Sequence, residues 1–99
     1  MEKWVPHYIL DMIKELIRAG KVDATTTAYR GARLLGIPGL DGMCEIVLSL
    51  TTADFHKSMT THADHRVWQD VYRPSTDFGG VYLKLTIIDD VLIVSFKEL

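Results

Sequence analysis

Tyr82 and Lys97 are the residues in this chain whose types and spacing first indicate chemistry. They lie in two segments of alternating apolar residues, 81–88 and 91–97, which residues 89–90 separate. A turn at residues 89–90 folds the segments into a β-hairpin and sets Tyr82 directly opposite Lys97. Directly opposed Cβ atoms lie about 5 Å apart, so a phenol and an ammonium converge on one face. Such a pair suits the binding of an anion, although an ordinary exposed cross-strand contact is the simpler interpretation.

The same turn fixes the register of the whole hairpin, because a shift of one residue would move every side chain to the other face. On the apolar face, this register pairs Ile87 with Leu92, Leu85 with Val94 and Leu83 with Phe96. On the opposite face, it pairs Thr86 with Ile93 and Lys84 with Ser95. The apolar face should pack on the core and leave the other face open.

Further polar side chains precede the hairpin and extend the candidate site. In a regular strand over residues 66–73, Gln69 and Arg73 share one face, while Trp68 and Tyr72 take the other, and the pattern leaves open which face is buried. The sheet then offers hydrogen-bond donors but no carboxylate pair and no glycine-rich phosphate loop. These donors are Lys57, Gln69, Arg73, Tyr82, Lys84 and Lys97. That composition suits binding a phosphate and stabilising negative charge that develops on it.

Other groups that could do chemistry give weaker signals. His56 precedes Lys57, and both reach one site only if their strand is irregular or near its end. His62, Asp64 and His65 form the nearest approach to a metal site, but their spacing is more typical of a polar loop, so we expect no metal and no cofactor. Cys44 lies in an apolar run and is expected to be a small core residue.

The composition limits the class of protein. Ninety-nine residues with 47% apolar content predict a single domain over residues 1–99. The sequence begins without an apolar leader and contains no run of about 20 apolar residues, so we expect a cytoplasmic protein and no membrane contact. The formal net charge is −2. A polyanionic partner would therefore have to be attracted by a local cluster of Lys and Arg.

The elements that must position these residues follow from periodicity. Helices are expected over residues 7–19, with Pro6 at the start and Gly20 as the stop, and over residues 25–35, with Gly36 as the C-terminal cap. Asp41 should cap a third helix that ends near Leu50, although residues 46–48 would also fit a buried strand. Strands are expected over 54–61 and 66–73, before the hairpin. This order predicts an α+β fold, with N-terminal helices on one face of a C-terminal antiparallel sheet.

Several long blocks of this sequence closely resemble the MqsR (motility quorum-sensing regulator) toxins. They are residues 57–61 (KSMTT), 68–74 (WQDVYRP), 81–84 (VYLK) and 90–98 (DVLIVSFKE). Residues 1–3, 6–7 and 41–44 agree as well. The resemblance implies a RelE/YoeB-like fold and the toxin of a type II toxin-antitoxin system. It also implies a metal-independent endoribonuclease that cleaves mRNA at sites containing a G-C step, and a cognate zinc-containing, DNA-binding antitoxin.

Carried over by motif, the resemblance implies catalytic roles for Lys57, Gln69, Tyr82 and Lys97. Arg73, His56, Met59 and Lys84 are assigned to substrate binding. The family commonly has Tyr where this chain has His56. An imidazole there would stack on a base or titrate near pH 6.5.

The implied reaction is attack of a 2′-hydroxyl on the adjacent phosphodiester. Lys97 and Lys57 would stabilise the phosphate, Tyr82 would donate or accept a proton, and Gln69 would position the substrate. Two alternatives remain open from sequence alone. One is a helix-turn-helix transcription regulator, although the expected third helix offers no Arg, Asn or Gln to read bases. The other is a non-catalytic interaction module.

Overall fold

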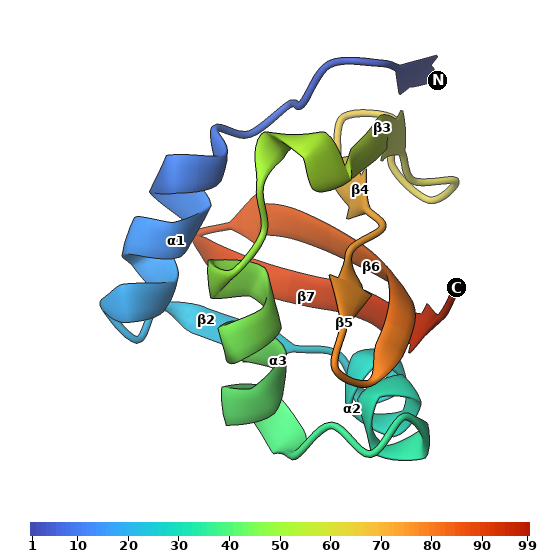
Figure 1. The fold of residues 1–99 in the computed structure, drawn as a ribbon. Helices are drawn as coiled ribbons and strands as arrows, with labels where there is room; N and C mark the ends of the chain where they lie inside the picture. Colours follow the sequence, from blue (N-terminus) through green and yellow to red (C-terminus); the bar gives the residue numbers. More distant parts are fainter.

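The computed structural model describes all of residues 1–99 and has an α+β fold (Figure 1). The helices are α1 (Leu10–Arg18), α2 (Thr26–Leu34) and α3 (Gly39–Leu48), and a short 3-10 turn spans Thr52–Asp54. The strands are β1 (Glu2–Lys3), β2 (Val22–Ala24), β3 (Phe55–Thr60), β4 (Trp68–Tyr72), β5 (Ser75–Thr76), β6 (Gly79–Ile88) and β7 (Asp90–Glu98). The expected fold class is confirmed.

The strands form one sheet in the order β1-β3-β4-β6-β7-β2, with β5 paired to β6 off this path. All pairings are antiparallel except that of β2 with β7, which is parallel. The two outer strands, β1 and β2, are only two and three residues long. Neither was expected, because so short a segment carries no readable periodicity.

The first helix begins at Leu10 rather than at residue 7, so the expected start at Pro6 is wrong. The backbone N–H groups of His7 and Tyr8 donate to the Asp70 carboxylate at 3.0 and 2.9 Å, which fastens this segment to β4. The helix buries its apolar stripe against the core, and the chain turns away at Gly20, whose φ is 77°. The expected stop at Gly20 is confirmed.

The second and third helices end close to the expected positions. The Thr25 hydroxyl accepts from the Ala28 N–H at 3.0 Å and caps α2, and Gly36 follows the helix with φ 83°. The third segment is helical, so the alternative strand is wrong, and it begins at Gly39 rather than at an Asp41 cap. Pro38 occupies the N-cap of this helix. Its ring and its missing N–H prevent the helix from extending further toward the N-terminus.

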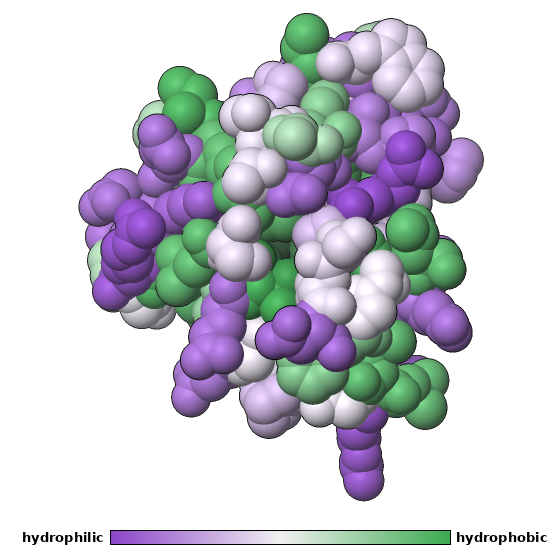
Figure 2. All heavy atoms as spheres, viewed as in Figure 1, coloured by the Kyte–Doolittle hydropathy of each residue, from purple (hydrophilic) through white to green (hydrophobic).

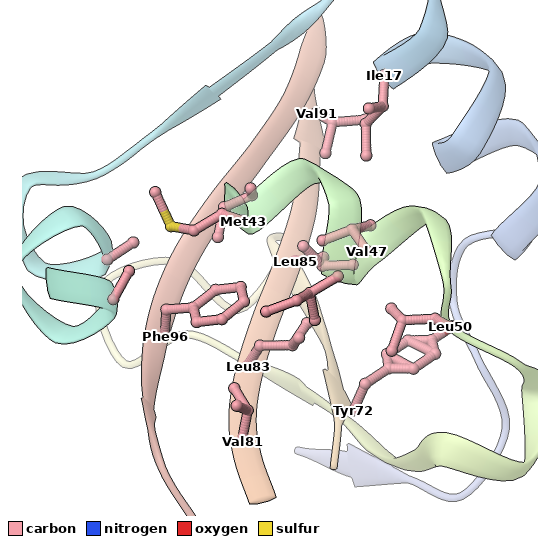
Figure 3. Packing of buried hydrophobic residues seen from close by; sticks show 14 of the residues in the cluster. Ile17, Met43, Val47, Leu50, Tyr72, Val81, Leu83, Leu85, Val91 and Phe96 are labelled. Atoms are coloured by element: carbon pink, nitrogen blue, oxygen red, sulfur yellow. The ribbon is translucent and has the colours of Figure 1, made fainter. Parts of the chain in front are cut away.

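The core lies between the helices and one face of the sheet. Figure 3 shows Met43 and Val47 of α3 facing Phe96, Leu83 and Leu85 of the sheet, all within one buried apolar cluster. On the outer surface seen from the helix side, apolar residues form separate groups among hydrophilic ones (Figure 2). None of the helices is long and apolar enough to cross a lipid bilayer. The helices thus cover one sheet face and leave the other without a helical layer.

The β6–β7 hairpin confirms the register near the candidate site. Tyr82 lies opposite Lys97, Leu83 opposite Phe96 and Lys84 opposite Ser95. Beyond Lys84 the register shifts by one residue, and the observed pairs are Leu85 with Ile93, Thr86 with Leu92 and Ile87 with Val91. The expected pairs Leu85 with Val94, Thr86 with Ile93 and Ile87 with Leu92 are therefore wrong.

Two local irregularities explain this partial agreement. The chain reverses at Asp89, whose φ is 63°, between the paired residues Ile88 and Asp90, so the turn is tighter than expected. An Asp tolerates this left-handed conformation better than most side chains do. Val94 then forms a bulge without a partner, which restores the expected register toward Lys97.

Candidate active site

The open face of the sheet collects side chains from four strands. The register places Lys57 opposite Val71, Val71 opposite Lys84 and Lys84 opposite Ser95, so one row crosses β3, β4, β6 and β7. Directly opposed residues point to the same side of a sheet. Val71 is fully buried although it is absent from the core beneath the helices, as expected for a residue flanked by long lysine stems. Lys57 and Lys84 therefore share the open face.

Two ammonium groups lie near the Tyr82 ring on this face. The Lys97 Nζ is 5.1 Å from the centroid of the Tyr82 ring, and the Lys84 Nζ is 6.0 Å from it. Both distances are within the range of cation–π attraction. Partial burial lowers the pKa of Lys84, and the nearby Lys97 and Lys57 lower it further. Three lysines thus lie close enough to repel one another, which is a favourable setting for an anion.

Lys57 carries the one ion pair on this face. Its Nζ is 3.1 Å from the Glu2 Oε1, and the Lys57 side chain is 20% exposed while that of Glu2 is 46% exposed. Glu2 reaches this position because β1 pairs with the edge of β3, which sets Glu2 opposite Met59. Glu2 was missed in the sequence, because nothing in the pattern indicated a two-residue strand at the start of the chain.

Gln69 and Met59 lie directly opposite each other on β4 and β3, on the same side as Lys57. The Gln69 side chain makes no hydrogen bond within the protein, so its carboxamide is available to a ligand. Arg73 follows β4 and is exposed. Its backbone N–H donates to the Asp54 carbonyl at 2.8 Å, but its guanidinium makes no ion pair.

His56 joins the same region because β3 is irregular. The register shifts between Phe55 and Lys57, so His56 lies in a bulge. Strict alternation, which would place His56 and Lys57 on different faces of the sheet, therefore does not apply here. Partial burial lowers the pKa of His56, Arg73 and Lys57 lower it further, and Glu2 opposes the shift. The expected condition for His56 and Lys57 to reach one site, an irregular strand, is confirmed.

The N-terminal segment is fastened to the opposite side of β4. Asp70 is fully buried and accepts the two backbone hydrogen bonds that hold residues 7–8. The His7 ring stacks on Trp68 with centroids 5.3 Å apart and planes at 15°, and the Lys3 Nζ lies 4.2 Å from the centre of the Trp68 ring. Tyr72 is buried beneath the helices, whereas Trp68 lies beneath this segment. These contacts fix the position of residues 1–8 relative to the site.

Two weaker candidates lie outside this face. Asp64 pairs with Arg66 at 3.1 Å rather than with the nearby histidines, and the chain has no group of three or more His, Cys, Asp or Glu arranged to hold a metal ion. Cys44 on α3 is partly buried and packs against the edge of the core, so the expected core position is confirmed only in part. Burial raises the pKa of the Cys44 thiol, and Asp41 adds to this effect.

The fold and the site define a small α+β protein whose open sheet face combines cations, a phenol and a free carboxamide, a set suited to a phosphodiester. The sequence model of the family described as "Motility quorum-sensing regulator, toxin of MqsA" matches residues 5–98. The chain is also similar to a protein of Escherichia coli strain K12 named "mRNA interferase toxin MqsR", with 54% identity over 98 residues that cover 99% of each chain. The chain therefore belongs to the motility quorum-sensing regulator toxin family, and the resemblance of the sequence blocks is confirmed.

Proposed function

We propose that this chain is an mRNA interferase, the toxin of a type II toxin-antitoxin pair, and that its active site is the open sheet face. The observation that carries the proposal is the opposition of Tyr82 and Lys97, with the Lys84 ammonium also within 6.0 Å of the Tyr82 ring centroid. The name of the Escherichia coli relative supports the same activity. A phosphodiester placed here would meet two ammonium groups and one proton-transfer group.

The proposed reaction is cleavage by the substrate's own 2′-hydroxyl. The 2′-oxygen forms a bond to phosphorus, the bond from phosphorus to the 5′-oxygen breaks, and the products are a cyclic phosphate and a free 5′-hydroxyl. A base takes the proton of the 2′-hydroxyl, and an acid gives a proton to the departing 5′-oxygen. Lys97 and Lys57 stabilise the additional negative charge.

The remaining residues have supporting roles in this proposal. Tyr82 takes part in proton transfer within the field of Lys97. The lowered pKa of Lys84 makes its ammonium a readier proton donor than an ordinary lysine. Gln69 positions the substrate through its free carboxamide, and Arg73 grips a neighbouring phosphate through two parallel hydrogen bonds. Met59, opposite Gln69, offers an apolar contact to a base.

The partner and the cleavage preference are also proposed. The family description names an antitoxin, MqsA. We infer that a cognate protein of that kind silences this chain, and that it contains zinc and binds DNA. Cleavage at a site containing a G-C step and a cytoplasmic location remain predictions.

The mechanism is tested with Tyr82→Phe and Lys97→Met, assayed against an mRNA in excess EDTA. Each variant should lose cleavage by about 10²- to 10⁴-fold, because each removes a proton-transfer or charge-stabilising group while leaving its shape nearly intact. Matched controls are Tyr29→Phe and Lys21→Met, which change exposed residues on the helical side and in a turn. Thermal unfolding should be unchanged in all four variants.

Full activity in both site variants would refute the mechanism. Absence of cleavage by the unmodified chain in EDTA would instead favour a non-catalytic interaction module or a requirement for the ribosome.

A further inference from the structure

Trp4 is a large aromatic side chain that the core does not use. It is 69% exposed, between β1 and the segment that leads into α1. Its ring centroid lies 6.3 Å from that of His56, with an interplanar angle of 63°. The edge contact with His56 leaves most of the indole surface open to a ligand.

Trp4 is held in place although it is exposed. On one side, Lys3 pairs with Ser58 in the sheet. On the other, His7 donates its backbone N–H to the buried Asp70 at 3.0 Å. Only a short stretch separates these anchors, so the indole is presented at a defined position beside β3. A preorganised aromatic surface loses little conformational freedom when a ligand stacks on it.

The surroundings of Trp4 indicate the chemistry of that ligand. His56 links Trp4 to the cations of the open face, because its ring lies 6.3 Å from the Trp4 ring and Lys57 follows it directly in β3. Lys57 and Arg73 are also near enough to lower its pKa. An apolar ring next to several phosphate-binding cations fits a nucleotide, whose base stacks while its phosphate is bound.

We propose that Trp4 and His56 form a nucleobase-binding subsite, in which a base of single-stranded RNA stacks on the Trp4 indole while an adjacent phosphate contacts Lys57 or Arg73. This inference rests on the proposed function and adds a residue outside the sheet to it. Stacking of this kind accepts any base, because every base has a flat aromatic face. The subsite therefore adds affinity and fixes the position of the RNA along the open face.

Binding is measured with the full chain carrying Tyr82→Phe, which prevents cleavage and keeps all cations. The probes are a single-stranded RNA 12-mer and an abasic ribose-phosphate 12-mer with the same charge. Tryptophan fluorescence should be quenched by the RNA and not by the abasic probe. Adding Trp4→Ala should weaken RNA binding about tenfold and leave abasic binding unchanged.

Trp4→Phe keeps a smaller ring, so it should retain most of the RNA affinity while losing the fluorescence quenching. Leu34→Ala is the matched control for removal of an exposed apolar side chain and should bind RNA normally. Equal RNA affinity with and without the Trp4 ring, or equal loss for both probes, would overturn the subsite. A loss of binding to a partner protein alone, with RNA affinity intact, would also overturn it.

The failure of this inference is distinguishable from failure of the proposed function. In the cleavage-competent chain, Trp4→Ala should raise KM about tenfold with little change in kcat, because the stacked base is not part of the reacting group. A chain that never cleaves RNA refutes the function. A chain that cleaves RNA with an unchanged KM after Trp4→Ala refutes only the subsite.

Discussion

Three lysine ammonium groups, those of Lys57, Lys84 and Lys97, lie on one face of the sheet with a single carboxylate, that of Glu2, paired to one of them. Partial burial lowers the pKa of Lys84, and repulsion from Lys97 and Lys57 lowers it further, so the lysines repel one another in the unliganded site. A bound phosphate relieves that repulsion. Glu2 relieves part of it in the free protein and must share Lys57 with any phosphate that binds there.

His56 should make RNA binding dependent on pH. Its pKa lies below the ordinary 6.5, first because of partial burial and then because of Arg73 and Lys57, with Glu2 opposing. The free protein therefore holds His56 neutral at pH 7, and a bound phosphate favours its protonated form. By linkage, RNA affinity should rise as pH falls below about 6.5.

The measurement is the Kd of the Tyr82→Phe chain for single-stranded RNA at pH 7.5 and pH 5.5, with and without His56→Gln. The affinity gain attributable to His56 should be about two- to fivefold, the size of a screened surface interaction. The stability of the free chain should change in the opposite direction. Because the pKa of His56 is lower in the folded state than the unfolded value of 6.5, the contribution of His56 should reduce the free energy of unfolding as pH falls from 6.5 through the lowered pKa. An identical pH dependence in both proteins would contradict the assignment.

The sequence could place only part of this site. Tyr82 and Lys97 were predictable because hairpin alternation assigns faces without knowledge of the rest of the fold. His56 depended on a bulge, which alternation does not reveal. Glu2 and Trp4 belong to a segment whose position is set by Asp70, more than sixty residues away in the chain. Local patterns do not encode such long-range contacts.

The packing of α2 on β7 supports the position of Lys97. A Cβ atom added at Gly31 would lie 1.7 Å from the carbonyl oxygen of Phe96, the residue that precedes Lys97. The helix backbone therefore lies directly against the strand, and only Gly permits that approach. Any larger residue must push the strand or the helix away.

Gly31→Ala should lower the free energy of unfolding by about 1–3 kcal/mol or more, through overpacking. This sign is informative, because Gly→Ala inside an exposed helix normally raises stability by about 1 kcal/mol. Urea unfolding measures the difference, and Arg30→Ala, at the neighbouring exposed position, should stay within about 0.5 kcal/mol of the original chain. A stabilised Gly31→Ala protein would show that α2 does not pack as closely as described.

Element boundaries were predictable where local chemistry decides them and not elsewhere. Gly20 and Gly36 end their helices through positive φ angles, which the residue type itself favours. The start of α1 depends instead on the hydrogen bonds from residues 7–8 to Asp70, so a favourable Pro at position 6 did not begin the helix. In the hairpin, a tighter turn and a bulge at Val94 compensated for each other, which preserved the expected pairing at Tyr82.

For the molecule as a whole, the net charge is −2, whereas the open face carries Lys57, Lys84 and Lys97 with the single carboxylate of Glu2 paired to Lys57. The other two ion pairs, Arg18 with Glu15 and Arg66 with Asp64, are local and exposed, and lie away from the open face. Four of the thirteen acidic side chains, Asp11, Glu15, Asp41 and Glu45, lie on the helices, which cover the opposite face of the sheet. The negative net charge should make the long-range attraction of RNA weak, whereas the cations of the open face should bind RNA strongly at short range. The dependence of the RNA Kd on salt concentration measures the contribution of these cations.

RNA affinity should fall linearly with salt on a double-logarithmic plot. If Lys57, Lys84, Lys97 and Arg73 each neutralise one phosphate, the slope for a single strand should be about −3, since each contact contributes about −0.7. Removing one contact with Lys84→Met should reduce the slope by about 0.7, whereas Lys21→Met, outside the site, should leave it unchanged. Titrations of the Tyr82→Phe background between 50 and 300 mM salt, roughly the range where counterion release dominates, measure these slopes. A slope near zero would mean that RNA does not bind through the cationic face, and equal slopes for both lysine variants would remove Lys84 from the interface.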